Sequence, residues 1–154
     1  MINQKKGKSN VQLAGMVIWA LLSAVFAAMT AIFAKVGLEG VDSDLATLVR
    51  TFLILLVLGA FVAGTGKWSN PLHLSAKTLS FLTLSALATG ASWVFYFRAL
   101  KAGPASLVAP IDKLSLVMVA IFAVIFLGER PNGWGWLGIA MVAGGVVVLG
   151  LKRA

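Results

Sequence analysis

Two oppositely charged residues, Asp112 and Lys113, lie in a stretch of the chain that is otherwise apolar. Of the five acidic residues in the chain, Asp112 is the one that the pattern places well inside a helix. Charged side chains in such a setting are costly, and they usually face a cavity or a partner. The two residues are therefore candidates for a substrate or coupling-ion site, and a buried ion pair that joins two helices is the alternative.

The charged partners of these residues should come from other helices. Consecutive positions of a helix point about 100° apart, so Asp112 and Lys113 are not expected to pair with each other. Arg98 is the nearest candidate partner for Asp112, and Lys35 and Arg50 are two others.

Further candidates surround the charged residues in the sequence. Trp93 and Tyr96 can supply amphipathic walls to a cavity, or they can pack against lipid or the core. Ser115 completes the candidate set. Pro104 and Pro110 are expected to break the helical pattern, because proline lacks a backbone donor and frees a carbonyl one turn earlier.

Several kinds of chemistry have no support in the sequence. The chain has no cysteine, and its single histidine, His73, lies in an expected loop. No Ser/His/acid set and no metal-ligand cluster is recognisable, so we expect neither an enzyme nor a metal or cofactor site.

Five long apolar segments position these side chains, and they cover residues 12–34, 45–63, 79–100, 107–127 and 134–151. Each is close to the ~20 residues that an α-helix needs to cross a bilayer. Hydrophobic residues make up 60% of the chain and charged residues 12%, and the mean hydropathy is +0.96. The sequence therefore predicts an all-α integral membrane protein, with residues 1–154 forming one multi-pass domain.

The net charge of +8 does not indicate nucleic-acid binding, because the basic residues lie at helix ends and on the tails. Loop Lys and Arg residues set orientation in a membrane. With the N-terminus inside, Lys5, Lys6, Lys8, Lys67, Lys77 and Arg130 face the cytoplasm, and Lys35, Arg50, Arg98, Lys101, Lys113, Lys152 and Arg153 lie toward the other side. This weak bias leaves two alternatives, an N-inside protein and insertion in both orientations.

Small residues recur on one face of the fifth segment. Gly138, Met141, Val142, Gly145 and Leu149 follow a three- and four-residue spacing that lets helices approach closely. This face is a candidate dimer interface, and packing inside one chain is the alternative. The spacing resembles a signature in the last helix of the small multidrug resistance family, although the first helix lacks the acidic residue of that family.

Residues 99–129 begin with Ala-Leu-Lys-Ala-Gly-Pro-Ala-Ser and end with Phe-Leu-Gly-Glu. Together with residues 138–146, this order resembles the EamA domain of the drug/metabolite transporter superfamily. Arg50 also lies where that family often has an arginine. Leu116 stands where the family often has a proline, which puts a second kink there in doubt.

The resemblance implies a secondary transporter, an exporter or exchanger of small organic metabolites or drugs. Members of the family commonly contain two five-helix domains in inverted orientation, so one such domain implies an antiparallel homodimer with ten helices. The expected partners are a second copy, a small-molecule substrate and membrane lipid, and the expected location is a bacterial inner membrane. A non-transporting membrane subunit or a lipid-handling accessory protein is the alternative.

Overall fold

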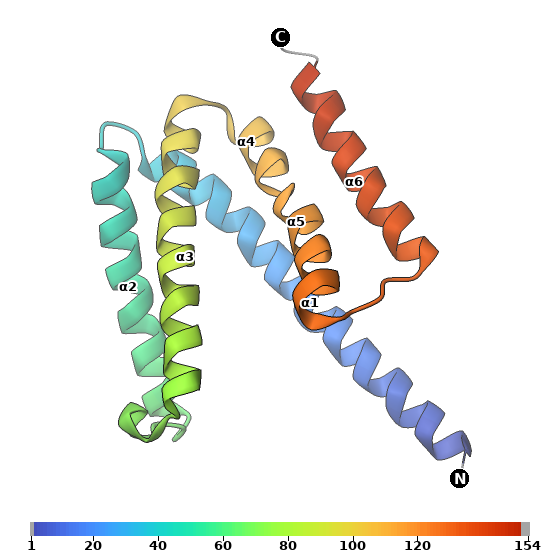
Figure 1. The fold of residues 1–154 in the computed structure, drawn as a ribbon. Coiled ribbons are helices and arrows are strands. Elements are labelled where there is room, and N and C mark those ends of the chain that lie inside the picture. The colour runs from blue at the N-terminus through green and yellow to red at the C-terminus, as the bar shows by residue number, and fades with distance from the viewer. Residues whose placement is uncertain (1, 152–154) are drawn as a thin grey trace.

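The computed structural model describes residues 2–151, with side chains for residues 12–150 except Leu72. Its helices are α1 (Ile2–Gly37), α2 (Ser43–Gly64), α3 (Ala76–Ala102), α4 (Ala105–Asp112), α5 (Ser115–Phe122) and α6 (Gly133–Leu151), with a short 3₁₀ helix η1 (Pro71–His73) and a π-helical segment η2 (Ala123–Leu127) (Figure 1). The described residues contain no strand.

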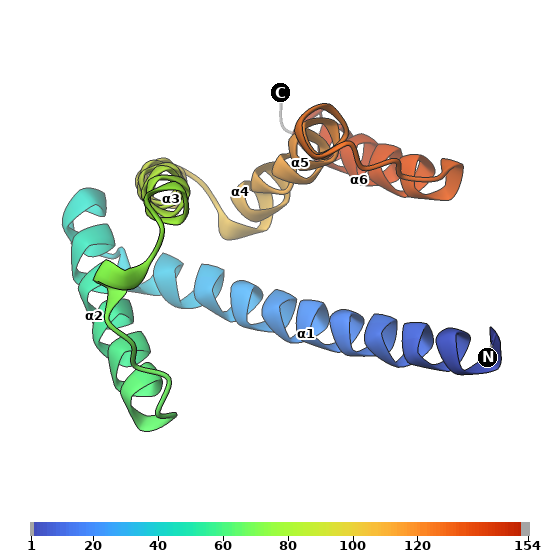
Figure 2. The ribbon, with the colours of Figure 1, turned by 60° about the horizontal axis from the view of Figure 1, so that its bottom comes forward.

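The helices form an open arrangement rather than a closed bundle. α2 and α3 run side by side, α1 crosses the molecule diagonally, and α6 packs on α4 and α5 (Figure 1). Seen from the turned view, α1 lies apart from α6 over much of its length (Figure 2). α1 makes its contacts with α3 and α4, which brings parts of α1 to α4 together on one side.

Five segments of the described chain are long and apolar enough to cross a membrane: Gln12–Gly37, Ser43–Gly64, Ala76–Ala102, Ala105–Leu127 and Gly133–Gly150. They confirm the five predicted helices, with ends that differ by up to three residues. The chain is a multi-pass membrane protein.

Local polar residues explain where α2 and α3 begin. The Asp42 carboxylate accepts hydrogen bonds from the backbone N–H groups of Asp44 and Leu45, at 2.9 and 3.1 Å, and so caps α2. Ser75 caps α3 in the same way, because its hydroxyl accepts from the Thr78 N–H. The predicted start of α3 at residue 79 was therefore too late.

The predicted start of the first helix, at residue 12, was also too late for the helix as a whole. α1 begins at Ile2, and only its apolar part starts at Gln12. Hydrophobicity marks where a helix enters lipid, whereas Lys and Gln are good helix formers that let the helix continue into water.

The fourth segment is interrupted, and the interruption lies close to Pro110. α4 ends at Asp112, and the N–H groups of Lys113 and Leu114 bond three residues back, to the carbonyls of Pro110 and Ile111. Pro104 caps the start of α4, so only Pro110 lies inside a helix near the break. The sequence predicts a break at this proline, and the crossing segment Ala105–Leu127 divides into α4 and α5 close to it, because proline weakens the α-helical ladder.

Glycines close two helices in different ways. Gly128 ends η2 in a left-handed conformation, with φ of 67°, which glycine adopts without steric cost. Gly103 follows α3 in an extended conformation, with φ of −140° and ψ of 172°. The reason is Pro104, because a residue before proline is driven to extended backbone.

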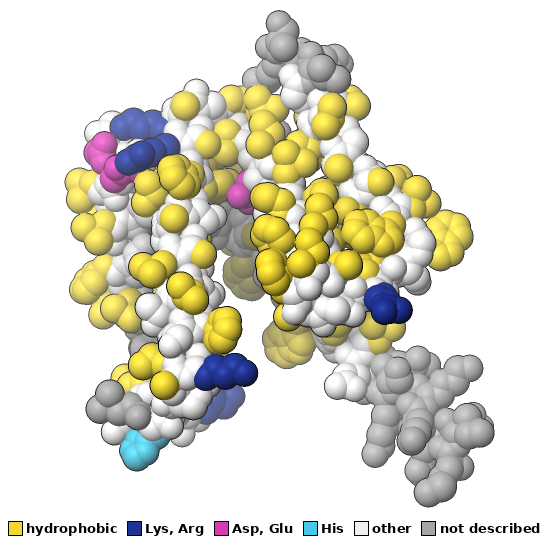
Figure 3. Space-filling view, in the orientation of Figure 1, with side chains coloured by type: hydrophobic (Ala, Val, Ile, Leu, Met, Phe, Trp, Pro, Cys, Tyr) yellow, Lys and Arg dark blue, Asp and Glu magenta, His cyan; other side chains and the backbone are white. Residues whose placement is uncertain are grey.

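The small core lies at the end of the molecule where α1 meets α2 and α3 meets α4. Leu38, Phe97 and Leu100 are buried there. Most other large hydrophobic side chains are exposed, and they cover much of the surface in Figure 3. Such a surface suits lipid, where exposed apolar side chains carry no cost.

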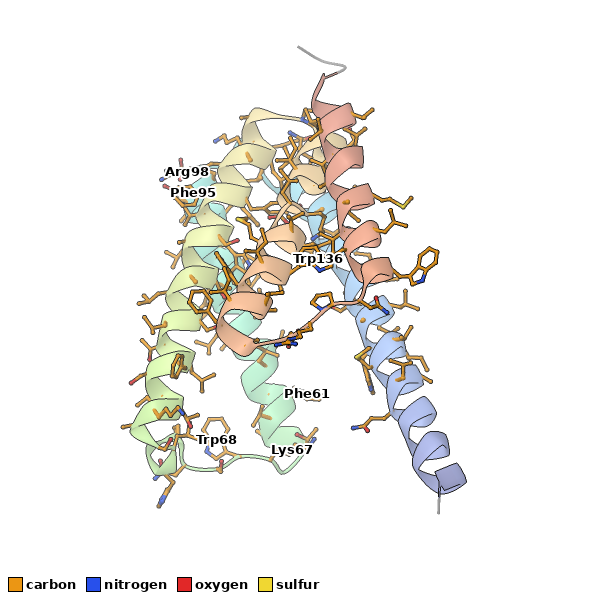
Figure 4. All side chains as sticks on the ribbon, turned by 45° about the vertical axis from the view of Figure 1, so that its right-hand side comes forward. Phe61, Lys67, Trp68, Phe95, Arg98 and Trp136 are labelled. Carbon is orange, nitrogen blue, oxygen red and sulfur yellow. The ribbon has the colours of Figure 1, made fainter. Side chains whose placement is uncertain are left out.

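Interfacial residues mark the helix ends. Figure 4 shows Lys67 and Trp68 in the connection after α2, and Trp136 in the first turns of α6. The Trp68 side chain is exposed, as expected for an aromatic residue at headgroup level.

Candidate functional site

A cavity of about 390 Å³ opens among α1, α2, α3 and α4. Five of the predicted site residues line it, and they are Arg50, Trp93, Tyr96, Asp112 and Lys113. On the face drawn in Figure 3, the surface is hollowed between α3 and α5. The cavity thus gathers charged and aromatic side chains from four helices within the membrane-crossing region.

The depth of the cavity follows from helix geometry. Arg50 lies seven positions after the start of α2 at Ser43, and Asp112 lies seven positions after the start of α4 at Ala105. At 1.5 Å per residue, each residue lies about 10 Å along its helix from the helix start.

Arg50 is held by aromatic rings. Its guanidinium carbon lies 4.5 Å from the ring centre of Trp93 and 5.3 Å from that of Phe97. Both rings come from α3, one turn apart, so they form a platform that faces α2. Cation–π attraction of this kind is worth about 0.5–2 kcal/mol, more when water is excluded. Arg50, one of the predicted site residues, thus lines the cavity beside these rings.

Asp112 and Lys113 contact each other, contrary to the prediction. Lys113 Nζ lies 3.4 Å from Asp112 Oδ2, and both side chains are partly exposed. The prediction assumed a continuous helix, in which neighbouring side chains diverge. Because α4 ends at Asp112, Lys113 begins a turn and its long side chain can reach back.

Arg98, the expected partner of Asp112, pairs with Asp44 instead. Arg98 Nε donates to Asp44 Oδ1 at 2.9 Å and Nη2 donates to Oδ2 at 2.6 Å. This bidentate pair joins the end of α3 to the start of α2, and both side chains are about half exposed. Arg98 does not line the cavity and points outward from α3 in Figure 4.

Lys35 also does not pair with Asp112, because its side chain bonds to backbone carbonyls near the end of α3. Its ammonium group donates to the carbonyls of Leu100 and Gly103, at 2.5 and 2.9 Å. These carbonyls belong to the end of α3, where no intrahelical donor follows. Lys35 therefore fastens α1 to the α3–α4 connection, and Ser115, exposed at the start of α5, also lies outside the cavity lining.

Among the polar and aromatic lining residues, four were not predicted: Ser23, Phe26, Thr30 and Ser92. The first three come from α1 and are spaced three and four residues apart, so they share one helix face. The hydroxyl residues Ser23 and Thr30 are seven positions apart in an apolar segment, and this spacing was the sequence signal that could have identified the face. Ser92 adds a third hydroxyl beside Trp93.

A second hollow, of about 580 Å³, adjoins the cavity. Thr30 and Arg50 line both, so the two spaces meet at these residues. The remaining walls of the second hollow carry no polar side chain and include Phe33, Leu53 and Phe97. A charged compartment and an apolar one therefore share a boundary at Arg50.

The small-residue face of α6 borders a third hollow within the same chain. A groove of about 740 Å³ lies between α1 and α6, and Met141, Val142, Gly145 and Leu149 line it on the α6 side. Alanines of α1, such as Ala24 and Ala28, line the opposite side. Both walls are thus made of small or apolar residues.

The described residues contain no group of three or more His, Asp or Glu side chains that could hold a metal ion. The cavity instead offers charge, hydroxyl donors and aromatic faces. Such groups bind and orient polar organic solutes rather than activate a bond.

Membrane-crossing helices that surround charged side chains are typical of proteins that move polar solutes through a bilayer. This chain therefore falls in the class of multi-pass membrane transporters. Its residues 14–151 match the EamA-like transporter family, and the chain belongs to that family. The resemblance noted in the sequence is thereby confirmed.

The relatives of the chain carry transporter or flippase names. A Sinorhizobium protein named as an uncharacterized transporter in the cobO 3′ region is 60% identical over 131 residues, which cover 85% of this chain and 93% of that protein. The riboflavin transporter of Rhizobium johnstonii is 27% identical over 80% of this chain and 41% of its own length. A probable 4-amino-4-deoxy-L-arabinose-phosphoundecaprenol flippase subunit, ArnE of Yersinia pestis, is 28% identical over 47% of this chain and 63% of its own.

The chain thus spans nearly all of the Sinorhizobium relative but less than half of the riboflavin transporter. Membership in a transporter family supports the prediction that the protein is not an enzyme. No solved structure matches the chain.

Proposed function

We propose that this membrane transporter is a secondary transporter, an exporter or exchanger of small organic metabolites or drugs. The observation that carries the proposal is the cavity among α1 to α4, where Arg50, Asp112 and Lys113 meet aromatic and hydroxyl side chains. Its volume of about 390 Å³ lies in the range of small-molecule sites.

The break between α4 and α5 supports the same proposal. Transporter sites commonly form where a membrane helix is discontinuous, because freed backbone groups and flanking side chains can then face a solute. Asp112 and Lys113 lie at such a break.

We propose further that the working unit is an antiparallel homodimer. The riboflavin transporter of Rhizobium johnstonii is more than twice as long as the segment that matches this chain. Two copies of this chain in opposite orientations would supply ten crossing helices. The small-residue face of α6, which includes Gly138 and Gly145, is the proposed contact between them.

A second candidate function is a subunit that needs a different partner. The name of the Yersinia pestis relative, a flippase subunit, favours this candidate. The two candidates differ in whether this chain alone moves a solute. Counterflow by the purified chain in liposomes supports the transporter, whereas flux that requires a second protein supports the accessory subunit.

The decisive variant is Asp112→Asn, which keeps the shape and hydrogen bonding of the side chain but removes its charge. We expect flux in liposomes to fall to background while the melting temperature stays within a few degrees of wild type. The Lys113 contact is long and exposed, so its loss should cost no more than about 1 kcal/mol. A structural ion pair would instead leave Lys113 uncompensated, at a cost of about 3–5 kcal/mol. A stable and fully active variant would remove Asp112 from the transport mechanism.

A further inference from the structure

Arg50 carries a positive charge that forms no ion pair with any acidic side chain of the described residues. Its guanidinium contacts the rings of Trp93 and Phe97, and in the described part of the chain it has no hydrogen-bond acceptor and no ion pair. A guanidinium is always protonated and offers five N–H donors, and ring faces engage few of them. A cation in this state, about 10 Å inside a membrane helix, is a costly arrangement unless something else pairs with it.

The other charges of the cavity largely satisfy each other. Lys113 Nζ lies 3.4 Å from the Asp112 carboxylate, so that pair is close to neutral. With Arg50 the three charged lining residues sum to +1. The cavity is therefore complementary to one negative charge, and the hydroxyls of Ser23 and Thr30 add further donors.

The space next to Arg50 is apolar. The second hollow begins at Thr30 and Arg50 and is otherwise lined by residues without polar side chains, including Phe33, Val49 and Leu53. A ligand that reaches Arg50 with one end can therefore place the rest of its body against carbon atoms. Each additional methylene buried there would favour binding by about 0.8 kcal/mol.

Building on the proposed transport function, we infer that the ligand is an amphipathic organic anion. A carboxylate or a similar anionic group pairs with Arg50, and an aromatic or branched apolar body fills the hollow lined by α1, α2 and Phe97. Arginine suits this role because its planar fork matches a carboxylate with two parallel hydrogen bonds. The rings of Trp93 and Phe97 hold the fork in place before the ligand arrives.

The test compares ligands that differ only in charge. The full chain in lipid nanodiscs is titrated with benzoate, 2-naphthoate and octanoate, and with the alcohol and the amine of each carbon skeleton. We expect each anion to bind at least about tenfold more tightly than its alcohol, and the amine more weakly still, since a charge-assisted hydrogen bond is lost. Acetate, which has the charge without the body, should bind more weakly than octanoate.

Variants of Arg50 then test whether this residue pairs with the anionic group of the ligand. Arg50→Gln should weaken 2-naphthoate binding by at least about tenfold and remove the preference for the anion over the alcohol. Arg50→Lys keeps the charge but loses the planar fork, so its affinity for 2-naphthoate should lie between those of wild type and Arg50→Gln. Arg98→Gln is the matched control, because Arg98 pairs with Asp44 outside the cavity, and it should leave the binding constant unchanged.

The outcomes separate this inference from the proposed function. If the alcohol or the amine binds best in all three sets, the inference is wrong, whether or not those compounds are transported. If the anions bind best but Arg50→Gln keeps that preference, the assignment to Arg50 is wrong. If Arg50→Gln does not fold, the role of Arg50 is decided by Arg50→Lys, and the ligand class by wild-type binding of the anion, alcohol and amine of each skeleton. Tight binding of the anions without counterflow would uphold the ligand class and count against transport.

Discussion

Two arginines show how their surroundings decide what a residue type does in this protein. Arg50 lies in the cavity against two aromatic rings, and no carboxylate of the described residues forms an ion pair with it. Arg98 lies at the end of α3 and forms a bidentate pair with Asp44. Both looked like site residues in the sequence, but only Arg50 can meet a solute in the cavity.

We predict that Arg98→Gln leaves transport within about twofold of wild type and lowers the melting temperature only slightly, because exposed ion pairs contribute little to stability. Asp44→Asn should have the same small effect, and the double variant should be no worse than either single one. Melting curves and counterflow on the same preparations test this. Loss of flux in Arg98→Gln, with Asp44→Asn active, would show that Arg98 takes part in transport.

At the scale of elements, the broken pair α4 and α5 gives Asp112 and Lys113 their positions. Pro110 leaves the Ser106 carbonyl without its usual helical donor, and the chain tightens into a turn two residues later. The turn lets the two charged side chains face the same cavity, which a continuous helix would not do.

Pro110→Ala should restore the missing backbone hydrogen bond and favour a continuous helix. We predict a higher melting temperature, by an amount equivalent to at most about 3 kcal/mol, together with a clear loss of flux. Pro104→Ala is the control, because Pro104 caps α4 and lies outside the break. Unchanged flux in Pro110→Ala would mean that the break does not depend on the proline or does not matter for transport.

At the scale of the whole molecule, a single chain leaves its hollows open and leaves open space around Gly138 and Gly145 of α6. A methyl group added at Gly138 or Gly145 would meet no neighbouring atom within 4 Å in the single chain. Substitutions there can therefore report on a second copy without first disturbing the fold.

We predict that Gly138→Leu and Gly145→Leu dissociate the homodimer, because a bulky side chain keeps helix backbones apart. Crosslinking and size-exclusion profiles in detergent measure the change. Gly59→Leu in α2 is the matched control, since Gly59 also has open space around it and lies on a helix outside the proposed contact. Wild-type profiles for both α6 variants would place the contact elsewhere.

The antiparallel arrangement requires that the chain inserts in both orientations. The native chain has no cysteine, so single cysteines at Glu39 and Ser69, in the connections at opposite ends of α2, label without background. We predict that an impermeant thiol reagent reaches each site from both sides of the membrane. If each site labels from one side only, the antiparallel homodimer is excluded.

Much of the fold follows from local features of the sequence. The five crossing segments were predictable because lipid requires about 20 apolar residues with internally satisfied backbones. The cap at Asp42 was predictable because carboxylates accept from free N–H groups at helix starts. The early start of α1 was missed, since hydrophobicity reports the edge of the membrane rather than the end of a helix.

The candidate site was only partly determined in this way. The sequence identified Arg50, Trp93, Tyr96, Asp112 and Lys113 as residues of the right types, and all five line one cavity. The partners of the charges were decided by tertiary structure. Arg98 lies beside Asp44 and Lys35 beside the end of α3 because helix rotation and tilt come from packing between helices, which a sequence pattern does not encode.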